Sequence, residues 1–317
     1  MANFFSSLFS SPVKEEVVDG LTKSDRKKFD ILKYDGVRAQ RIGKLPYAIK
    51  CFTEALLIQE DMETMSYLVG AYTMVHEPEN ALDVLDRMLE LEPDRMNTLF
   101  SRVSVLFLLN REEEVVRDCR HILSLEPSNA LACYLLGKAL KNKGEVEEAI
   151  DAVSEGIRLK ENFSEAYLLR SELFLEKKEG TLALEDTDRV IANEGEEETA
   201  YLLRGKIHSF IQKKTEAEAD FRNVLALNPF HEDAALALAE LLEEMERWDE
   251  ALVALDDLIE LSPDLGKAYE KRAKIKKQRG DGQGAEEDEQ KAKELSDSKT
   301  EQSGQADFSK LYEGGIF

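Results

Sequence analysis

A spacing of 34 residues recurs along this chain and constrains its fold more than any other feature. Seven segments align with one another without a gap, and an earlier copy is one residue shorter. The eight copies begin at Phe29, Met62, Met96, Ala130, Ser164, Glu198, Glu232 and Gly266. They cover residues 29–299. Because a regular period of this length is typical of stacked supersecondary units, the sequence predicts a repeat architecture.

Within each copy, small residues and helix-ending residues recur at fixed positions, counted here from the first residue of the copy. Position 20 is alanine in seven of the eight copies, and position 8 is glycine, alanine or serine in six. Small side chains allow two helices to approach closely. Position 32 is proline in four copies, where it would end a second helix: Pro93, Pro127, Pro229 and Pro263. Each copy is therefore predicted to form a helix, a turn and a second helix.

These residues resemble the tetratricopeptide repeat, whose pattern places small residues at positions 8 and 20, a large one at 4 or 24, and proline at 32. Tyr167, Tyr201 and Tyr269 fit position 4, and the resemblance covers about 85 % of the chain. It implies an all-α fold, a right-handed α-solenoid of about eight helix-turn-helix repeats. An N-terminal extension with a short apolar segment (1–28) and a flexible C-terminal tail (300–317) would flank it.

Composition excludes several classes of function. The formal charge of −23 would repel a phosphate backbone, so we expect no nucleic-acid partner. No apolar run is long enough for a membrane span, and the opening residues lack a secretory signal, which favours a cytoplasmic protein. The three cysteines form no metal-binding or disulfide pattern, and no nucleotide-binding or hydrolase motif occurs. We therefore expect neither a cofactor nor an enzyme.

Positions 7 and 23 of the copies vary together. Four copies have Arg at position 7 and Asp at position 23: Arg102 with Asp118, Arg170 with Asp186, Arg204 with Asp220, and Arg272 with Asp288. Three others have Leu at position 7 with Val or Ala at position 23: Leu68 with Val84, Leu136 with Ala152, and Leu238 with Ala254. We interpret each Arg and Asp as a structural ion pair between the two helices of one repeat.

The resemblance also implies a binding surface, because the first helices of tetratricopeptide repeats line a concave groove with positions 2, 5, 9, 12 and 13. Carried over by alignment, these positions give large apolar side chains in the third to seventh copies. The partner-binding residues predicted in this way are Phe100, Phe107, Tyr134, Leu168, Leu175, Leu202, Phe210 and Leu236. The alternative is that the same side chains pack between neighbouring repeats as core.

The sequence therefore favours a protein-binding scaffold or adaptor that holds a polypeptide in the groove. The partner would offer apolar anchors and basic residues, because acidic residues accompany the groove at position 2. The alternative function is a structural subunit that self-associates through apolar terminal segments, which contain Phe4, Phe5, Leu8 and Phe9 at one end and Phe308, Leu311 and Tyr312 at the other.

Overall fold

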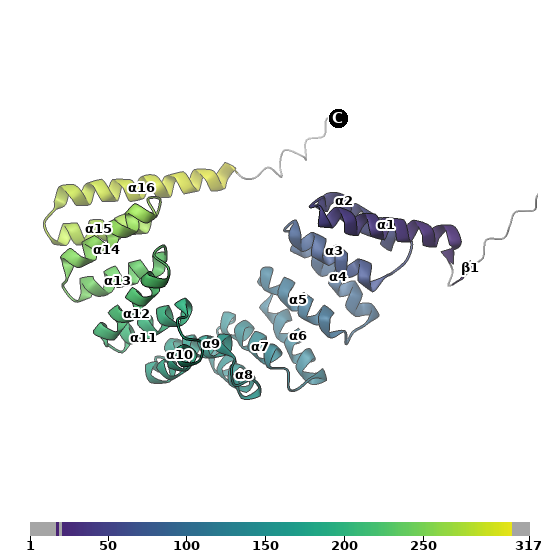
Figure 1. Cartoon of the computed structure of the whole chain (residues 1–317), viewed down its shortest axis with the longest axis horizontal. Helices are drawn as coiled ribbons and strands as arrows, with labels where there is room; N and C mark the ends of the chain where they lie inside the picture. Colours follow the sequence, from purple (N-terminus) through teal and green to yellow (C-terminus); the bar gives the residue numbers. More distant parts are fainter. Residues whose placement is uncertain (1–16, 19–20, 306–317) are drawn as a thin grey trace, which may run out of the picture. The chain divides into compact units, whose positions relative to one another are not determined.

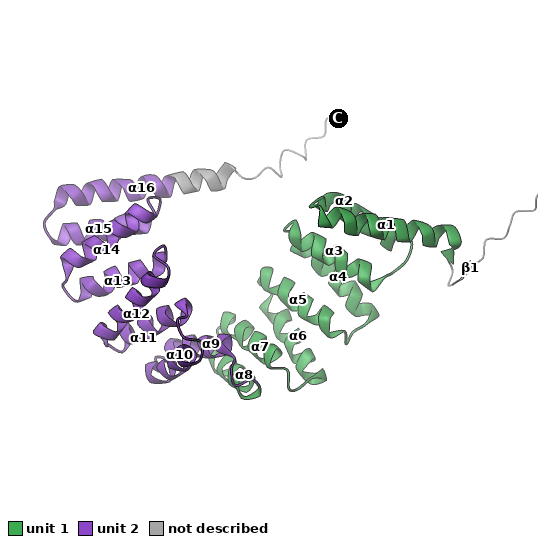
Figure 2. Cartoon of the chain, in the orientation of Figure 1, with its two compact units in different colours: residues 1–159 green, residues 160–317 purple. Residues whose placement is uncertain are grey.

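The computed structural model describes residues 17–18 and 21–305. Within them, sixteen helices follow a hairpin whose two strands have two residues each (Figure 1). The chain divides into two compact units, residues 1–159 and 160–317 (Figure 2). Consecutive helices contact one another within each unit. The predicted all-α solenoid is therefore confirmed. The apolar terminal segments on which the self-association hypothesis depends lie outside the described residues.

The first unit contains the hairpin and the first four repeats. Strand β1 (Val17–Val18) pairs antiparallel with β2 (Leu21–Thr22), with Val17 opposite Thr22. The helices are α1 (Lys23–Arg41), α2 (Leu45–Leu56), α3 (Met62–Met74), α4 (Pro78–Leu91), α5 (Met96–Leu108), α6 (Glu112–Leu125), α7 (Ala130–Asn142) and α8 (Val146–Leu159). Each odd-numbered helix and the helix that follows it form one repeat; we call them its A helix and its B helix.

The second unit contains the last four repeats. Its helices are α9 (Ser164–Glu176), α10 (Gly180–Glu194), α11 (Glu198–Phe210), α12 (Lys214–Leu227), α13 (Glu232–Glu244), α14 (Trp248–Leu261), α15 (Gly266–Gln278) and α16 (Gly282–Gln305). Helix α16 includes residues 300–305, which the sequence analysis assigned to a flexible tail. Its first-turn sequence contains two glycines, but the residues that follow are mostly Glu, Gln, Lys and Ala, which have good helix propensity.

Helix α1 begins before the first copy of the repeat pattern. The Thr22 side chain accepts a hydrogen bond from the Asp25 backbone N–H at 3.1 Å, and the Asp25 carboxylate accepts one from the Thr22 backbone N–H at 3.3 Å. This reciprocal capping box stabilises a helix start at Lys23. The first A helix is therefore 19 residues long, whereas the A helices of the later repeats have 13.

All eight turns between A and B helices use the same backbone conformation at position 15 of the repeat. Glycine occupies it in three repeats, at Gly43, Gly144 and Gly280. The other five residues also have a positive φ, and they are His76, Asn110, Lys178, Gln212 and Glu246. Next to each, the N–H at position 16 donates to the carbonyl at position 11, as from Lys213 to His208 at 2.8 Å. Every A helix thus ends in a Schellman motif.

Close contact between paired helices explains the small residues at positions 8 and 20. All eight residues at position 20 are at most 2 % exposed. At position 8, a Cβ atom added to Gly205 would lie 2.6 Å from the ring of Phe221, and one added to Gly36 would lie 2.5 Å from the ring of Phe52. The large residue at position 24 therefore occupies the space that the glycine leaves open, which preserves the packing density of the pair.

No helix in the described part of the chain combines the length and apolar character that a membrane crossing requires.

Candidate functional site

The predicted partner-binding residues lie on A helices and keep part of their surface accessible, with one exception. In the first unit, Phe100 and Phe107 on α5 and Tyr134 on α7 are half-buried. The Lys138 ammonium lies 5.2 Å from the centroid of the Phe107 ring, so α5 and α7 share one surface there. An apolar side chain beside a lysine from the next repeat can contact both an apolar and a charged group of a ligand.

In the second unit the same positions differ more in exposure. Phe210 on α11 is 45 % exposed, whereas Leu168 and Leu175 on α9 are half-buried and pack against buried residues of α10 and α11. Leu202 is half-buried against the cluster that contains Leu236. Leu236 itself is only 9 % exposed, so its side chain contributes to the core of its repeat. The binding role of these residues stays a prediction.

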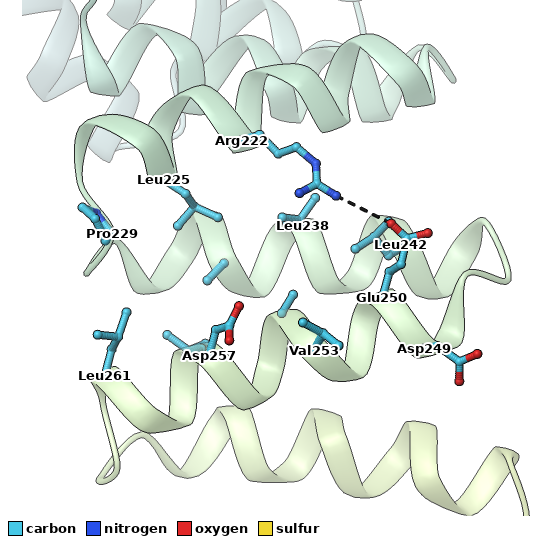
Figure 3. A pocket seen from close by; sticks show the side chains of 13 residues that line it. Arg222, Leu225, Pro229, Leu238, Leu242, Asp249, Glu250, Val253, Asp257 and Leu261 are labelled. Carbon is cyan, nitrogen blue, oxygen red and sulfur yellow. Dashed lines mark ion pairs between the residues drawn. The ribbon is translucent and has the colours of Figure 1, made fainter.

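A second surface lies on the opposite face of the A helices, where consecutive B helices flank a hollow. In the second unit, α12 and α14 form its walls, and Ala235, Leu238 and Leu242 of α13 form its floor (Figure 3). The cavity has a volume of about 470 Å³. Val253 and Leu261 on α14 are 57 % and 41 % exposed, which leaves apolar surface open to solvent. Sequence analysis did not predict this cavity, although repeat 7 has apolar residues at positions 7, 22 and 23.

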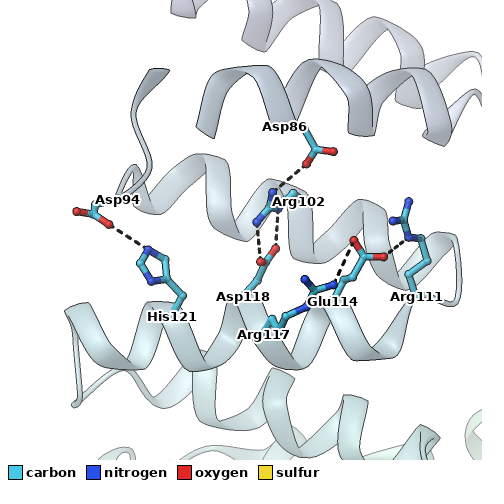
Figure 4. A network of polar contacts seen from close by, with 8 residues as sticks. All are labelled: Asp86, Asp94, Arg102, Arg111, Glu114, Arg117, Asp118 and His121. Atoms are coloured by element: carbon cyan, nitrogen blue, oxygen red, sulfur yellow. Dashed lines mark hydrogen bonds and ion pairs between the residues drawn. The ribbon is translucent and has the colours of Figure 1, made fainter. Parts of the chain in front are cut away.

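The first unit has a hollow of about 590 Å³ at the equivalent position, over α5 and between α4 and α6, but its floor is charged (Figure 4). The Arg102 guanidinium donates to Asp118 from Nε and Nη2, at 2.8 and 2.7 Å, and to Asp86 from Nη1, at 2.8 Å. His121 contacts Asp94 at 3.0 Å on the rim. Burial alone would lower the pKa of Arg102, but the hydrogen bonds with both carboxylates raise it, so the guanidinium remains charged.

The structure brings together all four Arg and Asp pairs that vary together in the sequence. Arg170 donates to both oxygens of Asp186 at 2.8 and 2.7 Å, and the Arg204–Asp220 and Arg272–Asp288 pairs have the same forked geometry. Each of the four aspartates is at most 5 % exposed. These pairs join the A and B helices of one repeat through charge-assisted, bidentate hydrogen bonds, and their structural role stays a prediction.

Sequence reasoning missed a third member of this network, an aspartate at position 25 of the preceding repeat. Asp86 contacts Arg102, Asp188 contacts Arg204 at 2.8 Å, and Asp256 contacts Arg272 at 2.6 Å. The signal was present in the repeat alignment, because Asp at position 25 occurs only in a repeat that precedes an Arg repeat. The correlation joins two neighbouring repeats, so a comparison of positions within single repeats does not reveal it.

Metal binding and thiol reactivity each set requirements for the described residues. Among the described residues, no group of three or more His, Cys, Asp or Glu side chains is placed to hold a metal ion. Burial raises the pKa of the Cys119 thiol to about 12, so this thiol is not a reactive thiolate near neutral pH. What both surfaces offer is contact area of mixed apolar and charged character.

Comparison with known proteins places the chain in a family. Tetratricopeptide repeat patterns match residues 130–163, 198–231 and 215–275. The photosystem I assembly protein Ycf3 of Acaryochloris marina is 30 % identical over 118 residues, which are 35 % of this chain and 70 % of that protein. The chain belongs to the tetratricopeptide repeat family. A solved tetratricopeptide repeat protein from Parabacteroides merdae has the same fold, with a TM-score of 0.61 and 17 % identity over 74 % of this chain and 92 % of that one.

Another relative is much longer than the matched region. The human protein O-mannosyl-transferase TMTC1 is 25 % identical over 221 residues, which are 67 % of this chain. Those residues make up only 24 % of the human protein, so the chain spans about a quarter of that relative. The similarity therefore concerns the repeat region.

Proposed function

We propose that this tetratricopeptide repeat protein is a non-enzymatic scaffold that binds a polypeptide along its A helices. The observation that carries the proposal is the row of partly exposed apolar side chains at equivalent repeat positions. In the second unit the row comprises Leu168, Leu175, Leu202 and Phe210, on two A helices that contact each other. Partly exposed aromatic and aliphatic side chains on a rigid support are typical anchors for a peptide ligand.

Charge determines which polypeptide would fit. The chain carries 65 acidic and 42 basic residues, and Glu165 and Asp233 at position 2 are exposed beside the row. In the first unit, by contrast, Glu63 at the same position is held by Lys33 at 2.7 Å. We therefore expect a partner with apolar anchors and some basic residues, bound chiefly by the second unit. The name of the Acaryochloris relative, an assembly protein, supports a scaffold role.

The test compares two exposed apolar residues of similar accessibility on different helices. Phe210→Glu changes the A-helix row, whereas Leu182→Glu changes a B helix, and the two side chains are 45 % and 41 % exposed. Affinity capture followed by quantitative mass spectrometry should show partners that bind the intact chain and Leu182→Glu but not Phe210→Glu. Circular dichroism should show that all three fold. If both variants retain the same partners, the A-helix row is not the binding site.

A further inference from the structure

The hollow over α13 in repeat 7 combines an apolar floor with an acidic wall. Leu225 and Pro229 line it from the α12 side, and Leu238 and Leu242 form the floor. On α14, Val253 and Leu261 expose apolar surface, and three acidic residues lie along the same helix: Asp249, Glu250 and Asp257. A ligand that covers Val253 and Leu261 would remove their apolar surface from water.

The charges around the hollow are not balanced. Arg222 on α12 lies 3.8 Å from Glu250 (Figure 3) and 2.9 Å from Glu218. Glu250 is closer to Arg247, at 2.6 Å, and Asp249 lies 3.1 Å from Arg279. Asp257 is exposed and has no ion-pair partner among the residues that the structure describes. The α14 wall therefore presents a carboxylate to any molecule that enters the hollow.

Repeat 7 has this surface because of its residues at four positions of the repeat pattern. The Arg repeats place a charged pair at positions 7 and 23, and in three of them the guanidinium lies over a tyrosine ring at position 4, as Arg272 lies 5.4 Å from the Tyr269 centroid. Repeat 7 has Ala235, Leu238 and Ala254 at these positions. Repeats 2 and 4 also have Leu at position 7, but they place Asp83 and Asp151 where repeat 7 has Val253.

We propose that this hollow is a second docking site, and that its occupant is a segment of a partner polypeptide with one bulky apolar side chain beside a Lys or Arg. The apolar side chain would contact Leu225, Val253 and Leu261, above the buried Leu238 and Leu242. The cation would lie against Asp257. The site uses positions 4, 7 and 11 of α13, whereas the A-helix row uses positions 5, 12 and 13. Those positions face opposite sides of an α-helix, so the two sites are independent.

The probe for this site is a random-peptide phage library presented to the intact chain. We expect the selected peptides to share a Leu, Ile or Phe next to a Lys or Arg. Their affinities are then measured by fluorescence anisotropy against two variants. Val253→Asp places at position 22 the aspartate that repeats 2 and 4 have there. Arg222→Asp with Leu238→Arg and Ala254→Asp gives the hollow the charged network of the Arg repeats.

Both variants should bind the selected peptides at least about tenfold more weakly than the intact chain, because a desolvated apolar anchor dominates such contacts. Phe210→Glu should leave the affinity unchanged, which separates this site from the A-helix row. Val253 is exposed, so its variant tests the site even if the triple variant does not fold. The proposal is overturned if no peptide is enriched, or if the selected peptides bind Val253→Asp as tightly as the intact chain.

Discussion

The hollows of repeat 3 and repeat 7 are built from the same repeat positions but have opposite chemistry. Over α5, Arg102 and Asp118 cover the floor with a forked ion pair, and Asp118 as a whole residue is 5 % exposed. Over α13, Leu238 and Ala254 occupy the equivalent positions, and the floor is apolar. The size of the cavity hardly distinguishes them, since the volumes are about 590 and 470 Å³.

This difference shows that the tetratricopeptide pair of helices accepts two solutions at positions 7 and 23. A charged pair gains direct hydrogen bonds but loses the hydration of both groups, and these two terms largely offset each other. An apolar pair has neither term. Repeats with a charged pair and repeats with an apolar pair can therefore be similar in stability. The surface they create is different. A charged floor disfavours an apolar ligand, and an apolar floor accepts one. One pair of residues can therefore set the surface chemistry of a repeat without a change of fold.

The largest expected effect comes from breaking the charged pair on one side only. Arg102→Leu would leave Asp118 buried without its cation, and such a change typically costs about 3–5 kcal/mol. The loss should appear as a lower melting temperature by circular dichroism. Hydrogen exchange should locate it in α5 and α6, because the stability of a repeat protein is largely a sum of local terms.

The matched control is the double variant Arg102→Leu with Asp118→Ala, which copies the Leu and Ala pair of repeats 4 and 7. It removes the buried charge together with its partner. Its stability should therefore be closer to that of the intact chain than the stability of Arg102→Leu is. Repeat 3 is the better place for this test than repeat 6, because in repeat 6 His208 also contacts Asp220, at 2.9 Å. Equal melting temperatures for the single and double variants would show that Asp118 does not depend on Arg102 for its contribution to stability.

A smaller effect should depend on pH in repeat 8. Burial by itself raises the pKa of Asp288, but hydrogen bonds from Arg272 and Lys276, at 2.6 and 2.9 Å, hold it below its ordinary value of 3.8. A carboxylate with a lowered pKa stabilises the folded state above its unfolded pKa, and this contribution is lost as the pH falls through the folded value. Asp288→Asn should therefore lower the melting temperature at neutral pH, and the difference should shrink below about pH 4.

Repeat 7 supplies the control for this titration. Its position 23 is Ala254, and the nearby Asp257 is exposed, so Asp257→Asn should have little effect on melting at any pH. A constant difference between Asp288→Asn and the intact chain from neutral to acidic pH would mean that the Asp288 charge contributes nothing. The effect of the substitution would then come from packing.

Sequence patterns predicted the fold and the pairs within repeats because both depend on residues at a fixed spacing. Alanine at position 20 and the Arg and Asp pairs at positions 7 and 23 are visible in the repeat alignment, and the helix pairs are where that alignment places them. The turn conformation was less visible. Gly144 suggests a positive φ at position 15, whereas Lys178 and Glu246 have the same conformation without a residue type that indicates it.

The candidate binding surfaces were harder to predict, because exposure depends on neighbours from other helices. Leu202 and Leu236 both occupy position 5 of their repeats, yet Leu202 is half-buried and Leu236 is 9 % exposed within its cluster. The cavity over α13 requires small or apolar residues from three helices at once. The sequence pattern of a single repeat does not predict a cavity that is lined by residues of two repeats.

The smallest expected effect concerns the outer aspartate of the repeat 3 network. The Asp86 side chain is 51 % exposed, whereas that of Asp118 is 7 % exposed, although both contact Arg102. Since water screens an exposed ion pair, Asp86→Asn should change the free energy of unfolding by less than about 1 kcal/mol. Asp118→Asn should cost clearly more, and both are measured by thermal melting at low and high salt. A loss from Asp86→Asn that equals the loss from Asp118→Asn would mean that burial does not determine how much each carboxylate stabilises the repeat.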